Sequence, residues 1–299
     1  MDQFSSHPLY RKHNLDSMMS MLWSFYAKNF LPLFLTSLVA SLGIQLLTTT
    51  IDFTSIYSMT DPMEQLNAMK SWFWPILGIG AIGLVMMLVI QYYIIYKPVD
   101  STVNIFNSVY KSLRYFFTFL VMMILFVILA TIAMIAGILV FIVGIFFAII
   151  YVYMIYVFIL PLLMCEGNNP GSAIGRTFTL SHRHFGPNLG WTAVILLIII
   201  VANLVLSSIV MLPFAGNFLK VLSNPEEAAE ILGFMSNPWF IGLSSLTNAI
   251  FAPVIPIFSA IIYFNARARE NEKPEPSEIA EEPQKVRIED LYPGSQDKK

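Results

Sequence analysis

The segment SHRHFGPNLG, residues 181–190, holds the side chains best suited to chemistry. Ser181, His182 and His184 stand beside an arginine, a combination that occurs in metal sites, hydrolases and phosphate-handling sites. A metal centre needs three or four ligands, and the chain has only four histidines and a single cysteine, Cys165. On a helix His182 and His184 would point apart, because residues i and i+2 do not face each other. We therefore predict no metal site and no cofactor.

Nucleophilic catalysis is no better supported by this segment. Ser181 and His184 would need a positioned acid to form a hydrolase triad, and the segment supplies none. We predict no catalytic residues here. One hypothesis remains for His182 and His184, which is that they gain and lose protons at the membrane surface.

The composition indicates a membrane protein. Of the 299 residues, 57% are hydrophobic and only 12% are charged, whereas a soluble domain has about 25% charged residues. So much apolar surface cannot be buried inside one water-facing domain. The net charge of −2 gives no basic field for nucleic acid, and one cysteine excludes an internal disulfide. The N-terminus lacks the order of a signal peptide.

The charge-free stretches define the expected spans. They are residues 29–51, 71–96, 115–165, 184–219 and 231–266. A helix crosses the hydrocarbon core with about 20 residues, so the longest stretch holds two helices, with a turn near Gly137 or Gly144. We predict an all-α integral membrane protein with six transmembrane helices. They are expected near 30–50, 72–96, 115–136, 139–164, 190–212 and 239–264.

The distribution of Lys and Arg predicts the orientation. With six spans, all but two of the 17 basic residues, Lys70 and Lys220, fall on one side of the membrane. Cytoplasmic loops carry the excess of Lys and Arg. Both termini are therefore expected in the cytoplasm, with the protein in the cell membrane, taken here as a bacterial inner membrane.

A short motif recurs before three of the spans. KSLRYF (111–116) and LSHRHF (180–185) share Ser-x-Arg-x-Phe, and AKNF (27–30) is a weaker copy. Upstream of each lies a stretch with helical apolar spacing, which suits an interfacial helix in contact with lipid. The predicted unit is an interfacial helix followed by a two-helix hairpin, used three times. The predicted membrane-boundary anchors are Lys28, Phe30, Arg114, Phe116, Arg183 and Phe185, joined by Arg267 and Arg269 after span six. The alternative is that basic and aromatic residues mark the boundary of any membrane helix.

Two outer loops and the C-terminal tail complete the organisation. The runs at 61–64 and 224–227 both place a capping residue, a proline and then an acid, and each should start a short helix outside the membrane. The domains are an N-terminal segment (1–28), a membrane domain (29–266) and a polar, disordered cytoplasmic tail (267–299). Within the tail, 286–292 is either a docking motif for a protein partner or solvated chain.

The spans carry few polar groups. No Asp, Glu, Lys or Arg lies in mid-span, where a charge would mark a transport path. The candidates are Gln45, Gln91, Asn203 and Asn248, which would either hydrogen-bond between helices or line a substrate path. Pro253 interrupts span six, and the break either kinks the helix or exposes carbonyls to a ligand.

The fourth loop resembles a known membrane domain. The run 158–190 and the closing YFNARARE (263–270) are similar to the domain attached to some bacterial glycerophosphoryl diester phosphodiesterases and to its stand-alone relatives. The matching residues are Pro161, Glu166, Gly167, Ala173, Arg176, Ser181, Arg183, Phe185, Tyr263, Arg267 and Arg269. In that family catalysis belongs to a separate soluble barrel, for which this chain has no room. The resemblance therefore implies a stand-alone membrane protein without that activity.

Three functions remain as hypotheses. The leading one is a non-enzymatic scaffold or accessory protein for a membrane partner, acting through the helix bundle and the tail. The second is a transporter or lipid-handling protein with a cavity between hairpins, which a polar cavity at Gln45, Asn203 or Asn248 would favour. The third is a membrane enzyme built on His182 and His184.

Overall fold

The computed structural model describes residues 4–51, 61–167, 169–216, 234 and 236–270. Within these residues helix is the only regular secondary structure, and six helices are long and apolar enough to cross a membrane. The prediction of an all-α, multi-pass membrane protein is confirmed at this level. The loop run at 224–227, the tail from 271 onward and its segment 286–292 lie outside the described residues.

The long helices follow the charge-free stretches of the sequence. They are α2 (Phe30–Thr48), α5 (Phe73–Tyr96), α7 (Phe116–Leu139), α8 (Phe141–Glu166), α10 (Phe185–Met211), α13 (Pro238–Phe251) and α14 (Val254–Ala268). Two differences from the predicted bounds stand out. Helix α10 begins at Phe185, earlier than position 190, and Pro187 lies in its first turn, where a proline is tolerated. The sixth span is two helices, since Pro253 and Pro256 lack the N–H groups that would continue the ladder of hydrogen bonds.

Short helices precede the long ones. They are α1 (Leu15–Lys28), α4 (Pro62–Ser71), α6 (Ile105–Ser112) with the 3-10 turn η1 (Leu113–Tyr115), and α9 (Pro170–Arg183), and the 3-10 turn η2 (Leu212–Phe214) follows α10. Side chains cap their first turns: Asn14 accepts from Ser17 N, Asp61 from Met63 N and Asn104 from Asn107 N. The cap at Asp61 is the one that the sequence predicts.

Each basic-x-Phe motif lies at a junction between two helices. Helix α1 ends at Lys28 and α2 begins at Phe30, while α9 ends at Arg183 and α10 begins at Phe185. In the third copy η1 separates α6 from α7, which begins at Phe116. The motif therefore marks the point at which the chain turns from a short helix into a long one.

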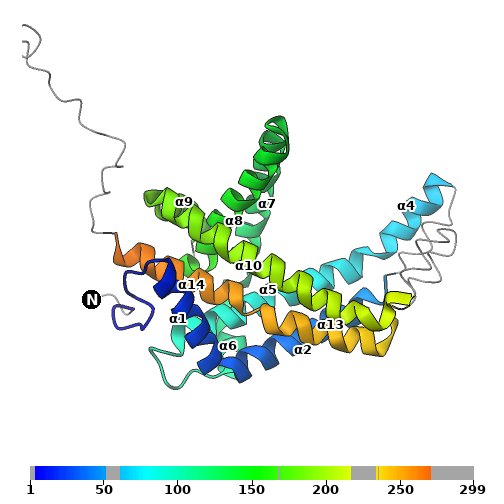
Figure 1. The fold of residues 1–299 in the computed structure, drawn as a ribbon, viewed down its shortest axis with the longest axis horizontal. Coiled ribbons are helices and arrows are strands. Elements are labelled where there is room, and N and C mark those ends of the chain that lie inside the picture. Colours follow the sequence, from blue (N-terminus) through cyan, green and yellow to red (C-terminus); the bar gives the residue numbers. More distant parts are fainter. Residues whose placement is uncertain (1–3, 52–60, 168, 217–233, 235, 271–299) are drawn as a thin grey trace, which may run out of the picture.

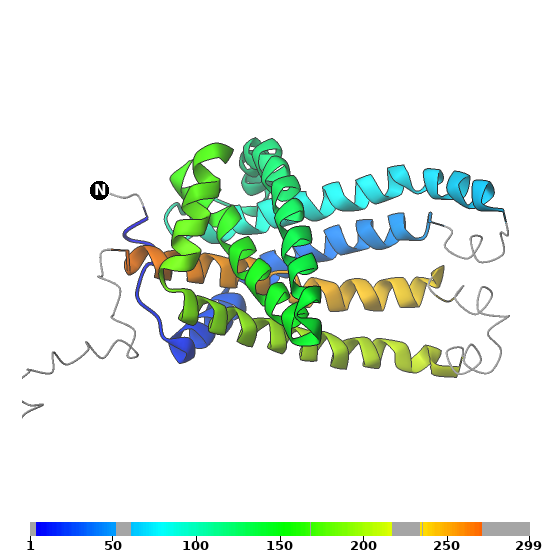
Figure 2. The same cartoon turned by 90° about the horizontal axis from the view of Figure 1, so that it is seen from above.

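Four long helices form a row from which a pair stands apart. In Figure 2, α5, α2, α13 and α10 run side by side in that order, and neighbours in the row are in contact. The pair α7 and α8 leaves this row at a steep angle (Figure 1). The second half of α8 is buried, whereas most of α7 and the first half of α8 are exposed or half-buried.

Helix α14 is the core of the protein. In the most apolar window of the sixth span, 78% of the residues are buried, against 11% for the span that contains α7. Its side chains from Pro256 to Ala266 are all buried, and the helix contacts α1, α5, α8 and α9. The last span is thus the centre around which the others pack rather than a lipid-facing helix.

The apolar stripes of α1 and α6 meet different surroundings. Met18 and Leu22 on α1 are fully buried, and α1 packs against α14. On α6, Phe106 and Tyr110 are 86% and 83% exposed. The same spacing of apolar residues therefore gives a protein-covered face in one helix and an open aromatic face in the other.

The turn between α7 and α8 depends on two glycines and supplies a test. A Cβ at Gly137 would lie 2.8 Å from the carbonyl oxygen of Gly144 and 3.0 Å from Cβ of Ala148. We expect Gly137→Ala to destabilise the protein by about 1–3 kcal/mol through overpacking. Thermal unfolding in detergent, followed by circular dichroism, measures the change. The control is Gly83→Ala in α5, where no atom lies within 4 Å of the added Cβ; an equal melting temperature for the two variants would contradict the close helix contact.

Candidate functional site

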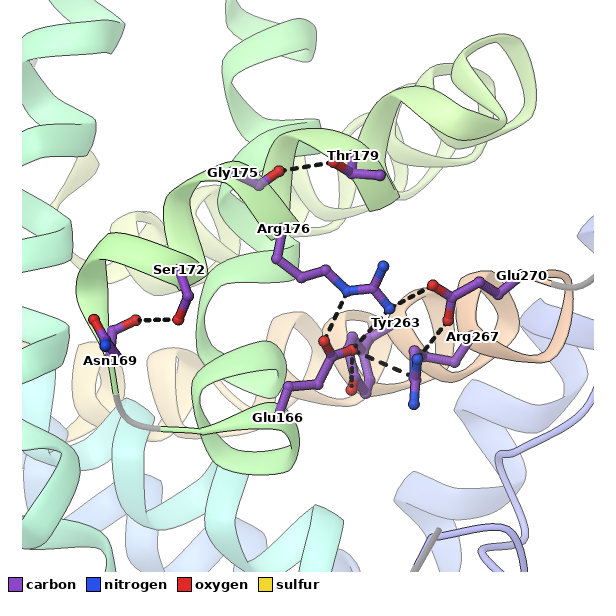
Figure 3. A network of polar contacts seen from close by, with 9 residues as sticks. All are labelled: Glu166, Asn169, Ser172, Gly175, Arg176, Thr179, Tyr263, Arg267 and Glu270. Atoms are coloured by element: carbon purple, nitrogen blue, oxygen red, sulfur yellow. Dashed lines mark hydrogen bonds and ion pairs between the residues drawn. The ribbon is translucent and has the colours of Figure 1, made fainter. Parts of the chain in front are cut away.

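Four charged side chains form a closed ring where α8, α9 and α14 meet (Figure 3). Arg176 Nε donates to Glu166 Oε2 at 2.7 Å, and its Nη2 lies 2.5 Å from Glu270 Oε1. Arg267 closes the ring, with Nε 3.3 Å from Glu166 Oε1 and Nη1 paired with Glu270 Oε2. Acid and base alternate around the ring, so its net charge is zero. We call these four residues the charged ring.

Local structure places each member of the ring. Glu166 is the last residue of α8, and Gly167 follows with φ of 131°, a conformation that residues with a side chain rarely adopt. The chain then starts α9 at Pro170, capped by Asn169 through a 3.0 Å bond from Gly171 N. Arg176 lies on the turns of α9 that follow. The glycine thus allows the sharp reversal that brings α9 beside the end of α8.

The ring is partly shielded and hydrogen-bonded to the core. Its side chains are only 19–27% exposed, and the hydroxyl of Tyr263 on α14 donates to Glu166 Oε1 at 3.0 Å. Burial by itself would raise the pKa of the Glu270 carboxyl, but the hydrogen bond and charge of Arg176, together with Arg267, hold that pKa below its usual value. Its contribution to stability is therefore present above pH 4.5 and is lost as pH falls through the lowered pKa.

The charged ring and Tyr263, which donates to it, include residues from both of the segments that carry the family resemblance. Glu166 and Arg176 come from the fourth loop, and Tyr263 and Arg267 come from the closing segment. The sequence predicts Arg267 as a membrane-boundary anchor, whereas the structure gives it two carboxylate partners. The pairing with Glu270 has a local signal in the sequence, the opposite charges at 267 and 270 on one helix face.

Arg269 belongs to a second network, with the N-terminal segment. Its Nη2 donates to the carbonyl of His13 at 2.7 Å, and its Nε donates to Asn265 Oδ1 at 3.2 Å. Asn265 Oδ1 also accepts from the backbone N–H of His13 at 2.8 Å. The guanidinium lies over the ring of Trp191, 5.6 Å from its centroid. This network fixes the chain before α1 to the end of α14.

His7 is a buried part of the same contact. Its ring stacks on Phe264 with centroids 4.4 Å apart, and its Nδ1 accepts from the N–H of Leu9 at 3.1 Å. The side chain is 3% exposed, and burial lowers the pKa of His7 to about 4. The sequence does not predict this role of His7, because nothing in a polar N-terminal segment indicates that it packs on a helix more than 250 residues away.

His182 has a structural position between three rings. It stacks between Phe178 and Phe185, with centroid distances of 5.6 and 5.8 Å. Its Nδ1 lies 2.9 Å from the carbonyl of Phe178, and its Nε2 lies 3.1 Å from the hydroxyl of Tyr151 on α8. A proton on Nδ1 satisfies both contacts at once. The residue therefore joins α9 to α8 and to the start of α10.

His184 stands at the N-cap position of α10, one residue beyond the end of α9. In the described part of the chain no three His, Cys, Asp or Glu side chains are grouped so as to hold a metal ion.

The other predicted anchors lie at the helix junctions. Lys28, Arg114, Phe30 and Phe185 are exposed, and Phe116 is half-buried. The guanidinium of Arg114 lies 4.6 Å from the centroid of the Tyr115 ring. Arg183 is half-buried at the end of α9, and anchoring of these side chains at a membrane boundary stays a prediction.

The structure brings two of the four intramembrane polar residues together. Gln45 on α2 and Asn248 on α13 line an open cleft of about 170 Å³ with α10. Asn203 points its amide to its own helix, donating to Ile199 O at 2.9 Å, and Gln91 is buried in α5 with no partner among the described residues for its Nε2. We call this space the polar cleft; its remaining lining residues are Ser207, Val210, Met211, Phe240, Ser244 and Thr247.

No protein-family model matches the sequence, and the comparisons with curated proteins and with solved structures give no match. Function is therefore argued from the charged ring, the polar cleft and the helix arrangement.

The charged ring leads to a prediction for Arg176, which bridges two carboxylates. Arg176→Gln should lower the free energy of unfolding by about 2 kcal/mol, between the values for exposed and buried ion pairs. Arg176→Lys should restore less than half of the loss, because an ammonium group cannot bridge two carboxylates as a guanidinium fork does. Thermal unfolding in detergent gives both values.

The control for this series is Lys111→Gln, which removes an exposed charge outside the ring and should change stability by less than 0.5 kcal/mol, as surface changes typically do. Glu270→Gln combined with Arg176→Gln should cost less than the sum of the single changes. Additive losses would show that the two residues are not coupled.

The packing of the chain before α1 against α14, called docking below, should depend on pH. The pKa of His7 falls from 6.5 to about 4 on burial, so docking is fully stable above pH 6.5 and weakens as pH falls from 6.5 toward 4. The total loss is roughly 3 kcal/mol. Limited proteolysis at residues before α1, between pH 7.5 and 4.5, measures it. In His7→Gln the pH dependence of the proteolysis rate should weaken, and the remainder should come from His13, whose pKa is also lowered by burial. An unchanged pH profile would assign the effect to other groups.

Proposed function

We propose that this protein is a non-enzymatic membrane scaffold or accessory protein that binds a partner within the bilayer. The observation that carries the proposal is the pair α7 and α8, whose outer halves pack mainly on each other. Large apolar side chains cover both helices there: Ile135 is 58% exposed and Phe146 is 63% exposed. A pair that projects in this way (Figure 1) offers apolar faces to another membrane helix.

Grooves on two sides of the pair support this role. One groove of about 220 Å³ lies between α7, α8 and α9 and includes Phe126 and Phe178. A second, of about 400 Å³, lies between the pair and the start of α14 and includes Tyr153 and Ile255. Apolar grooves between helices accept side chains of a partner helix by close packing, the main attraction between helices in lipid.

The membrane arrangement proposed with this function is three hairpins, α2–α5, α7–α8 and α10 followed by α13–α14. Each hairpin follows a short helix, and the open aromatic face of α6 suits an interfacial position. The excess of Lys and Arg supports a cytoplasmic location for both termini in the cell membrane. The tail would add a second contact for the partner.

The resemblance to the phosphodiesterase-associated membrane domain fits a role without catalysis. Four of the residues that carry it, Glu166, Arg176, Tyr263 and Arg267, contact one another. Their charges are engaged in joining α8, α9 and α14. A structural function explains this set of residues without any substrate.

A second candidate function, in solute or lipid handling, is favoured by the polar cleft. Gln45 and Asn248, from helices far apart in the sequence, line the same space. A polar cleft between helices of separate hairpins is the arrangement expected for binding a polar molecule at membrane depth.

Site-specific photo-crosslinking in native membranes tests the scaffold proposal. Benzoylphenylalanine replaces Ile135 on α7 or Phe146 on α8, and the matched controls are Leu197 and Leu204 on α10, which are 61% and 66% exposed. The proposal predicts a polypeptide adduct of defined mass at the first two positions and lipid adducts alone at the controls. Lipid adducts alone at all four positions would rule out a partner on the α7–α8 pair.

A further inference from the structure

The polar side chains of the cleft have no hydrogen-bond partner among the described residues. Asn203, Thr48 and Ser208 in the same helices each donate to a carbonyl one turn earlier in their own helix. In contrast, no hydrogen bond joins any of the five polar cleft side chains to the described part of the chain. These side chains are Gln45, Ser207, Ser244, Thr247 and Asn248.

The position of the cleft makes this lack of partners costly. Gln45 is close to the outer end of α2, and Asn248 is ten residues into α13, or about 15 Å along that helix. The cleft therefore extends from the outer boundary into the apolar layer, where an unpaired amide or hydroxyl costs several kcal/mol. The cleft is open, and Ser207 and Asn248 are exposed on its lining, so water or a bound molecule that enters it can supply the missing hydrogen bonds.

The lining residues define the chemistry of this molecule. None of the cleft side chains is Asp, Glu, Lys or Arg, so a charged ligand would find no counter-ion. Two amides and three hydroxyls both donate and accept, which matches hydroxyl groups. Val210, Met211 and Phe240 form an apolar wall for a carbon skeleton. The volume of about 170 Å³ corresponds to about six waters at roughly 30 Å³ each.

We infer that the polar cleft is a binding site for a small, uncharged, hydroxyl-rich group. Such a group is presented either by a free polyol or by the polyol head of a neutral lipid in the outer leaflet. This inference rests on the second candidate function. It is independent of the α7–α8 contact, because the cleft residues belong to α2, α10 and α13.

The experiment uses the methyl group of Met211 as a reporter. The protein carries ¹³C-methyl methionine in phosphatidylcholine nanodiscs, and two probes are added in separate titrations, glycerol and monoacylglycerol. A saturable shift of the Met211 signal with either probe supports the site. A shift with glycerol identifies a free polyol as sufficient, and a shift with monoacylglycerol alone identifies a lipid-borne group. The absence of a saturable shift with both probes overturns the inference.

Variants connect the signal to the cleft. Asn248→Leu and Gln45→Leu should each raise the half-saturating concentration of the probe by about tenfold, the typical effect of losing a hydrogen bond. Asn203→Leu is the matched control, since its amide serves its own helix, and it should bind as the unchanged protein does. Circular dichroism and gel filtration establish that each variant is folded. Equal binding by Asn248→Leu, Gln45→Leu and the control would overturn the assignment.

A competing occupant is a polar helix of another protein. Benzoylphenylalanine at Thr247 distinguishes it, because a polypeptide adduct at that position would overturn the polyol site. A lipid adduct, or none, together with the Met211 shift would support it. This outcome is separate from the crosslinks at Ile135 and Phe146, so each proposal can fail without the other.

Discussion

Pairing of charge at the membrane surface is the constraint on which the structure depends. A charged side chain next to an apolar layer must find an opposite charge or reach water. Glu166 ends α8, Arg176 lies on α9, and Arg267 lies near the end of α14. Their ring with Glu270 requires three segments that are far apart in the sequence to come together. Helix α14, which carries Arg267, is the buried helix that α1, α5, α8 and α9 contact.

The short length of α14 explains why the two halves of the molecule differ. It is a continuous buried helix only from Val254 to Ala268, so it fills the half of the bundle that holds the charged ring. Beyond the break at Pro253 the row of α5, α2, α13 and α10 continues without it, and α7 and α8 separate from that row (Figure 1). The polar cleft lies where this central helix is absent, and the groove beside Tyr153 lies at the start of α14. A packed half and an open half thus follow from one interrupted span.

Local features of the sequence predict more of this fold than long-range ones. Apolar length gives the spans, and Asp61 and Pro253 predict a helix start and a helix break from their own chemistry. The pairing of Arg267 with Glu166 is not predictable, because side-chain pairing across distant segments leaves no spacing to read. Periodicity reveals an apolar face on α1 and on α6 without revealing that protein covers only the first. In the same way, the meeting of Gln45 and Asn248 depends on how two helices are rotated, which tertiary packing decides.

The most direct test of this account is the side of the membrane on which the charged ring lies. In a Cys165→Ser background, single cysteines replace Ser172 on α9 and Glu64 on α4, both exposed positions. A membrane-impermeant thiol reagent is applied to intact cells and, separately, to permeabilised cells. The account predicts that the cysteine at 64 reacts in intact cells and that the cysteine at 172 reacts only after permeabilisation. Labelling at 172 in intact cells, or at 64 only after permeabilisation, would contradict it.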